Sequence, residues 1–109
     1  MASVFVQIAS YHDFELGKTI LHAIKQSSKN HEIHFGVFNC YYQNNDIYIP
    51  KVENLKVIEE EAPFGVGVGK SRNIANSLYS GQDYYLQVDS HTRFKQNWDE
   101  FLISQIKGY

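Results

Sequence analysis

The sequence predicts an α/β domain with a mostly parallel sheet and helices on both faces. Four segments rich in apolar and β-branched residues alternate with three segments whose apolar residues recur at helical spacing. A strand–helix–strand repeat of this kind places successive strands in parallel, because each helix returns the chain to the same end of the sheet. The 109 residues are 43% hydrophobic and 20% charged, which indicates one packed domain.

In the first half of the chain, residues 3–10 (SVFVQIAS) predict a buried strand. Apolar residues near helical spacing then predict an amphipathic helix over 14–27. A second buried strand is expected over 32–42 and a short third one over 55–61. The polar and turn-rich segment 43–54 between these two strands is expected to be a surface excursion.

In the second half, residues 74–79 predict another amphipathic helix, which Gly81 closes. The most strongly patterned strand follows over 83–90 (DYYLQVDS), and the last helix is expected over 98–107. This helix has no following strand to which it could connect. We therefore expect the sheet to be truncated and residues 1–109 to be the N-terminal part of a larger domain.

Charge and composition exclude several classes of partner. The net charge is −2 and no basic block occurs, which argues against nucleic-acid binding, because that needs clustered cations. The chain has no run of about 18 apolar residues for a membrane span and no basic leader. Cys40 is the single cysteine and lies in an apolar run, so we expect a buried thiol in a reducing, cytoplasmic setting.

The candidate chemistry lies at the end of the strand over 83–90, where Asp89 is followed two residues later by His91. Ligands of parallel α/β sheets bind at the carboxyl ends of strands, and residues i and i+2 of extended backbone point the same way. One carboxylate and one imidazole suit Mn²⁺ or Mg²⁺ better than Zn²⁺. The structural alternative is an Asp in a local turn beside an exposed His.

The glycine-rich stretch Phe64–Asn73 (FGVGVGKSRN) resembles a phosphate-binding loop only superficially. An ATPase P-loop needs a glycine five residues before Gly69, and Phe64 occupies that position. We expect instead a pliable backbone near the ligand, with Ser71 capping the following helix. Arg72, in the first turn of that helix, is placed to meet a nucleotide base or its phosphates, and its structural alternative is a solvated surface arginine.

The segment from Gly69 to Asp99 resembles the core of nucleotide-sugar glycosyltransferases of the GT-A fold. In those enzymes a loop and helix with a Ser/Ala-Arg-Asn start lead to a strand that ends in an Asp-x-Asp motif. The variant here, GQDYYLQVDSHTRF followed by NWD, is similar to Skp1-type polypeptide N-acetylglucosaminyltransferases. The N-terminal VQIASYHDFELGKTI resembles the first strand and loop of the same family.

The resemblance implies transfer of N-acetylglucosamine from a UDP-sugar to a hydroxyl acceptor, such as a protein hydroxyproline. It implies that Tyr11 stacks on uracil and that Asp13 binds the nucleotide, although Asp13 is equally a helix cap. Asp89 and His91 would hold the Mn²⁺ or Mg²⁺ ion. The implied nucleotide contacts are Ser10, Tyr11, Asp13, Arg72, Asn73, Asp89 and Ser90.

Two alternatives of other classes share these features. A nucleotide-binding module without catalytic turnover would have the same sequence. A receiver-type signalling domain shares the alternating pattern, but it needs acidic residues after its first strand, where this chain has Ala-Ser-Tyr. In either case an open edge of an incomplete sheet would invite self-association into a homo-oligomer.

Overall fold

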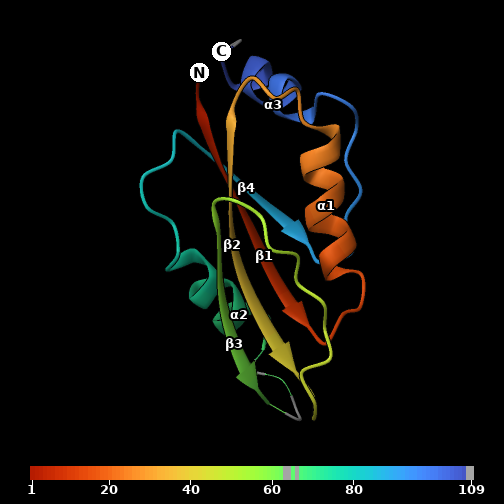
Figure 1. Ribbon diagram of the computed structural model, residues 1–109. Coiled ribbons are helices and arrows are strands. Elements are labelled where there is room, and N and C mark those ends of the chain that lie inside the picture. The colour runs from red at the N-terminus through yellow and green to blue at the C-terminus, as the bar shows by residue number, and fades with distance from the viewer. Residues whose placement is uncertain (63–64, 66, 108–109) are drawn as a thin grey trace.

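The computed structural model describes residues 1–62, 65 and 67–107, and it confirms the predicted α/β class. Four strands form one parallel sheet, and three helices lie against its two faces (Figure 1). The elements are β1 (Ser3–Tyr11), α1 (Leu16–Gln26), β2 (Glu32–Tyr41), β3 (Leu55–Glu61), α2 (Val68–Asn76), β4 (Tyr84–Asp89) and α3 (Trp98–Lys107).

The strand order in the sheet is β3-β2-β1-β4, so the N-terminal strand lies between β2 and the last strand. Ala9 of β1 is the register partner of Phe38 in β2 and of Asp89 in β4. The chain reverses its direction of travel across the sheet at β1, because β2 and β3 lie on one side of it and β4 on the other. In open α/β sheets such a switch point is where a crevice forms at the strand ends.

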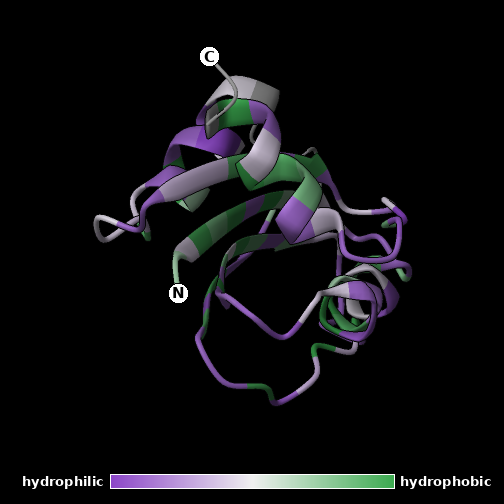
Figure 2. Ribbon diagram, turned by 90° about the horizontal axis from the view of Figure 1, so that it is seen from above, coloured by the Kyte–Doolittle hydropathy of each residue, from purple (hydrophilic) through white to green (hydrophobic). Residues whose placement is uncertain are grey.

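The main hydrophobic core lies between the sheet and the layer formed by α1 and α3. It includes the alternate β1 residues Val4, Val6 and Ile8, which are fully buried. A smaller cluster on the other face joins Phe38 and Ala75, which come from β2 and α2. In Figure 2 hydrophobic residues run along the inner strands, and hydrophilic residues dominate the connecting loops. The two clusters place helices on both faces, as the sequence predicts.

The α1–α3 layer is fixed by polar contacts as well as by packing. The buried Trp98 stacks near Phe94, with ring centroids 4.9 Å apart, and its indole N–H donates to the carbonyl of Ala23 (2.8 Å). Next to it, the buried carboxylate of Asp99 accepts from the backbone N–H (2.8 Å) and hydroxyl (2.7 Å) of Ser28. The start of α3 is therefore attached to α1, through Ala23, and to the α1–β2 connection, through Ser28.

The prediction that segment 43–54 is a surface excursion is wrong in part. Ile47 is 7% exposed and belongs to the main core, and Ile49 and Val52 pack against it. The polar neighbours of these residues are exposed, which explains the polar appearance of the sequence. Burial of a few apolar side chains holds an irregular segment against the domain without any regular pattern.

The predicted start of the second helix also needs correction. Gly67 is the N-cap, with a φ of 84°, and α2 begins at Val68. No side-chain hydrogen bond caps this helix, so Ser71 is not its cap, and Arg72 lies in the second turn. The left-handed backbone at Gly67 favours glycine, and this allows the chain to enter the helix earlier than the apolar periodicity indicates.

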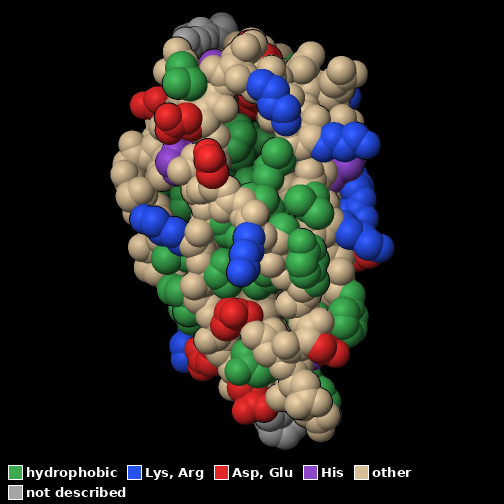
Figure 3. Space-filling model, in the orientation of Figure 1, with side chains coloured by type: hydrophobic (Ala, Val, Ile, Leu, Met, Phe, Trp, Pro, Cys, Tyr) green, Lys and Arg blue, Asp and Glu red, His purple; other side chains and the backbone are tan. Residues whose placement is uncertain are grey.

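The surface mixes charge types. On the face seen in Figure 3, basic and acidic side chains are interspersed with hydrophobic ones. None of the described helices is both long and apolar enough to cross a bilayer.

Candidate functional site

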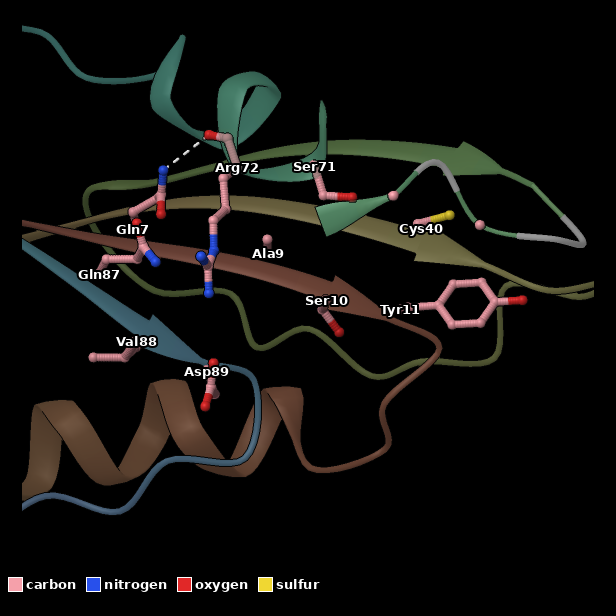
Figure 4. Close-up of a pocket in the computed structure, with 12 residues that line it drawn as sticks. Gln7, Ala9, Ser10, Tyr11, Cys40, Ser71, Arg72, Gln87, Val88 and Asp89 are labelled. Atoms are coloured by element: carbon pink, nitrogen blue, oxygen red, sulfur yellow. Dashed lines mark hydrogen bonds between the residues drawn. The ribbon is translucent and has the colours of Figure 1, made fainter. Parts of the chain in front are cut away.

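A cavity of about 330 Å³ lies at the carboxyl ends of β1 and β4, on the side of the sheet that α2 covers (Figure 4). This is the part of a parallel α/β sheet at which ligands bind. It is lined by Gln7, Ala9, Ser10, Tyr11, Cys40, Gly65, Gly67, Ser71, Arg72, Gln87, Val88 and Asp89.

The floor of the cavity follows from the strand register. Gln7 pairs with Gln87, and Ala9 pairs with Asp89. Alternate residues of a strand point to the same face, so these four side chains form two rows that face α2. The small side chain of Ala9 leaves space beside the carboxylate of Asp89, and this space is part of the cavity.

Arg72 extends from α2 over this floor, toward the end of β4 at which Asp89 lies (Figure 4). With the Gln87 amide turned so that its oxygen faces the guanidinium, that oxygen accepts from Nε (2.9 Å) and Nη2 (3.2 Å) of Arg72. The Gln87 nitrogen then donates to Oε1 of Gln7 (3.2 Å). Gln7 in turn donates to the backbone carbonyl of Arg72 (2.8 Å). Among the described residues, no carboxylate forms an ion pair with Arg72.

Asp89 is the last residue of β4, and its side chain is exposed to the cavity. Its backbone carbonyl accepts from the hydroxyl of Thr92 (2.8 Å), which begins the turn after the strand. Within the described part of the chain, the carboxylate of Asp89 forms neither a hydrogen bond nor an ion pair. Both of its oxygens are therefore available to a ligand.

His91 does not continue the strand. Because β4 ends at Asp89 and a turn follows, the expected extended geometry does not reach residue 91. The imidazole lies with Nδ1 3.3 Å from Oδ2 of Asp13, and its side chain is 67% exposed. His91 is thus at the rim and does not line the cavity, and Nε2 is the ring nitrogen left for another partner.

The Asp89 carboxylate and Nε2 of His91 are the candidate ligands for a divalent ion at this site. The described residues contain no group of three His, Cys, Asp or Glu side chains that could hold a metal. One unpaired carboxylate and one free imidazole nitrogen still match an ion that takes its other ligands from water and phosphate. A carboxylate and an imidazole are thus ligand types that suit Mg²⁺ or Mn²⁺ better than a structural Zn²⁺ site, which needs a closed set of protein ligands.

Asp13 connects the loops that follow β1 and β4. Its Oδ1 accepts from the backbone N–H of Glu15 (2.9 Å), and its Oδ2 accepts from the hydroxyl of Ser90 (2.6 Å). Burial alone would raise the pKa of this carboxyl, but the hydrogen bonds from Ser90, Glu15 and His91 outweigh it and lower the pKa. The expected helix-cap role is wrong, because Glu15 is the N-cap of α1 and no side chain caps it; Asp13 instead closes the turn before the helix through the N–H of Glu15. A nucleotide contact stays a prediction.

Two lining residues of β1 present groups that a ligand could use. Ser10 is 3% exposed, and its hydroxyl oxygen has no hydrogen-bond partner among the described residues. A buried hydroxyl without a partner is unfavourable unless water or a ligand satisfies it. Tyr11 is 49% exposed and lies at the end of the cavity farthest from Gln7 (Figure 4). A Cβ on Gly65 would lie 3.8 Å from the Tyr11 ring, which places that glycine beside it.

The structure thus brings together four of the predicted residues: Ser10, Tyr11, Arg72 and Asp89. The others lie outside the cavity lining: Asp13, Asn73, Ser90 and His91. Asn73 is exposed on α2, while Ser90 is buried, with its carbonyl bonded to the hydroxyl of Thr19 (2.7 Å).

Sequence reasoning missed Gln7 and Gln87. The signal that could have found Gln87 is its position two residues before Asp89, since both residues then point to one face of the strand. Gln7 has a weaker signal, a polar residue in the otherwise apolar centre of the first strand.

A parallel sheet with helices on both faces and a cavity at its switch point defines a small, Rossmann-like α/β domain of the ligand-binding class. Comparison with protein families makes the assignment more specific. A family model described as Glycosyltransferase (GlcNAc) matches residues 3–63 and 43–108. The chain therefore belongs to this glycosyltransferase family. No curated protein and no solved structure matches the chain.

Proposed function

We propose that the cavity binds the nucleotide of a UDP-sugar, UDP-N-acetylglucosamine, and that the domain serves transfer of that sugar to a hydroxyl acceptor. The observation that carries this proposal is that Arg72 and Asp89 line one cavity and that, among the described residues, neither has an ion-pair partner. In a member of a glycosyltransferase family, the donor is the ligand that such a cavity has to accept. The relation to GT-A, Skp1-type enzymes, with a protein acceptor and a cytoplasmic setting, belongs to the same proposal.

The cavity offers a group for each part of the donor nucleotide. The ring of Tyr11, which is 49% exposed, would stack on uracil, and stacking of a base on an aromatic ring contributes roughly 1–3 kcal/mol. The unpartnered hydroxyl of Ser10 can bond a polar atom of the nucleoside. Arg72 supplies the positive charge that phosphate oxygens need.

The same charge would favour the chemical step. When the bond between the sugar and the diphosphate breaks, negative charge grows on the departing phosphate oxygen. A guanidinium that is already oriented stabilises this charge without having to reorganise during the reaction. The acceptor oxygen forms the new bond to the sugar, and its proton passes to water or to the departing diphosphate.

We further infer that Asp89 and Nε2 of His91 would hold a Mn²⁺ or Mg²⁺ ion. An ion held by these two residues would supply positive charge that offsets the charge of the diphosphate. Asp13 would orient the imidazole through Nδ1, as carboxylates commonly do for metal-binding histidines.

Titration with UDP-N-acetylglucosamine, with and without Mn²⁺, tests the proposal. Asp89→Asn is compared with Asp83→Asn, because both positions adjoin β4, at its opposite ends. We expect wild type and Asp83→Asn to bind more tightly with Mn²⁺, and Asp89→Asn to lose this gain. Equal binding by both variants would remove Asp89 from the site.

Product formation separates a transferase from a binding module. The assay measures sugar transfer to a hydroxyl acceptor, or hydrolysis of the donor to UDP and free sugar. Donor binding with no release of UDP under any condition would favour the module without turnover.

A further inference from the structure

The side chain of Arg72 is oriented by uncharged groups. Its Nε and Nη2 donate to the Gln87 oxygen at 2.9 and 3.2 Å, and its own backbone carbonyl accepts from Gln7 at 2.8 Å. The two glutamines are register partners on neighbouring strands and also bond each other at 3.2 Å. The guanidinium and the backbone of one arginine are therefore held by a single connected pair of amides.

We propose that Gln87 and Gln7 are positioning residues, which aim Arg72 at the diphosphate of the donor while leaving its charge available. This inference rests on the proposed function for the identity of the anion. It adds that the two amides, which touch no reacting atom, determine how strongly the cavity binds phosphate.

The chemical argument concerns the type of group that contacts Arg72. A carboxylate in place of the Gln87 amide would orient the guanidinium equally well through two parallel hydrogen bonds. It would also neutralise the charge, and the cavity would lose its attraction for an anion. A neutral amide orients without neutralising, and no carboxylate among the described residues pairs with Arg72.

Geometry leaves enough donors for a ligand. A guanidinium has five N–H donors, and the Gln87 oxygen uses one on Nε and one on Nη2. Both N–H groups of Nη1 and the second one of Nη2 remain. The guanidinium lies above the cavity floor on the side toward Asp89 (Figure 4), so a diphosphate between Arg72 and Asp89 can accept from these remaining donors.

The burial of Gln7 indicates that its contacts with Arg72 and Gln87 are a specific feature of the fold. Gln7 is 2% exposed in the middle of β1, between Val6 and Ile8, where an apolar residue would ordinarily pack. A buried amide is tolerated only when its hydrogen bonds are satisfied. Gln7 satisfies its amide with Arg72 and Gln87, so the same contacts that justify its burial also fix the arginine.

The decisive variant is Gln87→Glu, which keeps the shape and the two hydrogen bonds from Arg72 but neutralises its charge. A carboxylate cannot donate to Gln7, so the variant is compared with Gln87→Met, which also lacks that bond but adds no charge. Affinities for UDP, inorganic pyrophosphate and uridine are measured with a chelator present, so that a metal does not contribute. We expect at least about tenfold weaker binding of UDP and pyrophosphate, since a neutralised guanidinium no longer attracts phosphate, and unchanged uridine binding. Gln105→Glu, on the exposed side of α3, is the control for added negative charge.

A second variant, Gln87→Met, keeps the side-chain length at residue 87 and leaves the charge of Arg72 unchanged. It removes the amide oxygen that accepts from the guanidinium. Here too we expect weaker UDP binding with unchanged uridine binding, and affinity that still falls as salt rises, because the free charge remains. For Gln87→Glu this salt dependence should be largely lost. Because a purely structural glutamine would affect uridine and UDP alike, the split between the two ligands identifies positioning.

The possible outcomes distinguish this inference from the proposed function. If wild type binds UDP and both Gln87 variants bind it equally well, the positioning role is overturned and the proposed function stands. If wild type binds pyrophosphate through Arg72 but does not bind UDP, the UDP-sugar assignment is overturned and the anion site stands. If folded wild type binds neither ligand, both are overturned.

Discussion

The hydroxyl of Ser90 donates to Oδ2 of Asp13 at 2.6 Å, which joins two loops that are 77 residues apart in the chain. One loop follows β1 and the other follows β4, the two strands whose carboxyl ends border the cavity. The same carboxylate also contacts His91 at 3.3 Å. Asp13 therefore holds the rim of the site together, whether or not it touches a ligand.

We expect Asp13→Ala to lower the free energy of unfolding by about 1–3 kcal/mol, because it removes several hydrogen bonds to a charged group. Urea denaturation measures this loss. Asp46→Ala is the matched control, since that carboxylate is 60% exposed and, among the described residues, pairs only with His12, a contact worth under about 1 kcal/mol. Equal losses in both variants would contradict the role given to Asp13.

The buried carboxylate of Asp99 predicts a larger effect. It is fully buried and accepts two hydrogen bonds from Ser28, so Asp99→Ala should cost about 3 kcal/mol or more in unfolding free energy. A double-mutant cycle with Ser28→Ala measures the coupling of the two side chains. Additive losses would show that the hydroxyl contact contributes nothing.

Two glycines should respond to alanine with opposite signs. A Cβ at Gly36 would lie 2.3 Å from the Phe5 ring, so Gly36→Ala should destabilise the fold by about 1–3 kcal/mol. Gly69 lies in α2 with no atom within 4 Å of an added Cβ, so Gly69→Ala should stabilise by about 0.5–1 kcal/mol. Thermal unfolding of both variants, with wild type as reference, checks the two signs.

The sequence predicted the strands and the outer helices well because their signals are local. The apolar β-branched runs and helical periodicities lie within single elements, and they are reproduced in β1, α1, β2, β3, β4 and α3. The start of α2 was not predictable in this way, because it depends on the left-handed backbone of Gly67. The burial of Ile47 likewise depends on tertiary contacts that local polarity conceals.

The sequence could predict those residues of the site that lie at the ends of strands. Asp89 and Tyr11 end their strands, and a parallel sheet necessarily brings such ends together. Arg72 required a resemblance, because its direction depends on how α2 packs. The pair Gln7 and Gln87 becomes evident only from the register between β1 and β4, which no single segment of sequence reveals.

The size of Ala9 predicts that filling the cavity floor blocks binding without unfolding the domain. Its side chain faces the open cavity beside Asp89, so Ala9→Leu should retain the wild-type circular dichroism and melting behaviour. Binding of UDP should fall by at least about tenfold, through steric exclusion worth 1.4 kcal/mol or more. Ala9→Ser, which barely changes the volume, should bind as wild type does. Unchanged binding by Ala9→Leu would place the ligand elsewhere.

Cys40 lines the cavity but is only 1% exposed, and this combination predicts an unreactive thiol. Burial, and then the charge of Glu60, raise the pKa of Cys40 above its ordinary value. Because the thiolate is the reactive form, alkylation by iodoacetamide should be slow in the native protein at pH 8 and fast in denaturant. The folded state binds this proton more tightly, so the contribution of Cys40 to stability falls as pH rises from the ordinary thiol pKa toward the raised one. Cys40→Ser should remove the alkylation signal and this part of the pH dependence. Rapid labelling of the native protein at pH 8 would contradict the prediction and show that the thiol becomes exposed in the folded state.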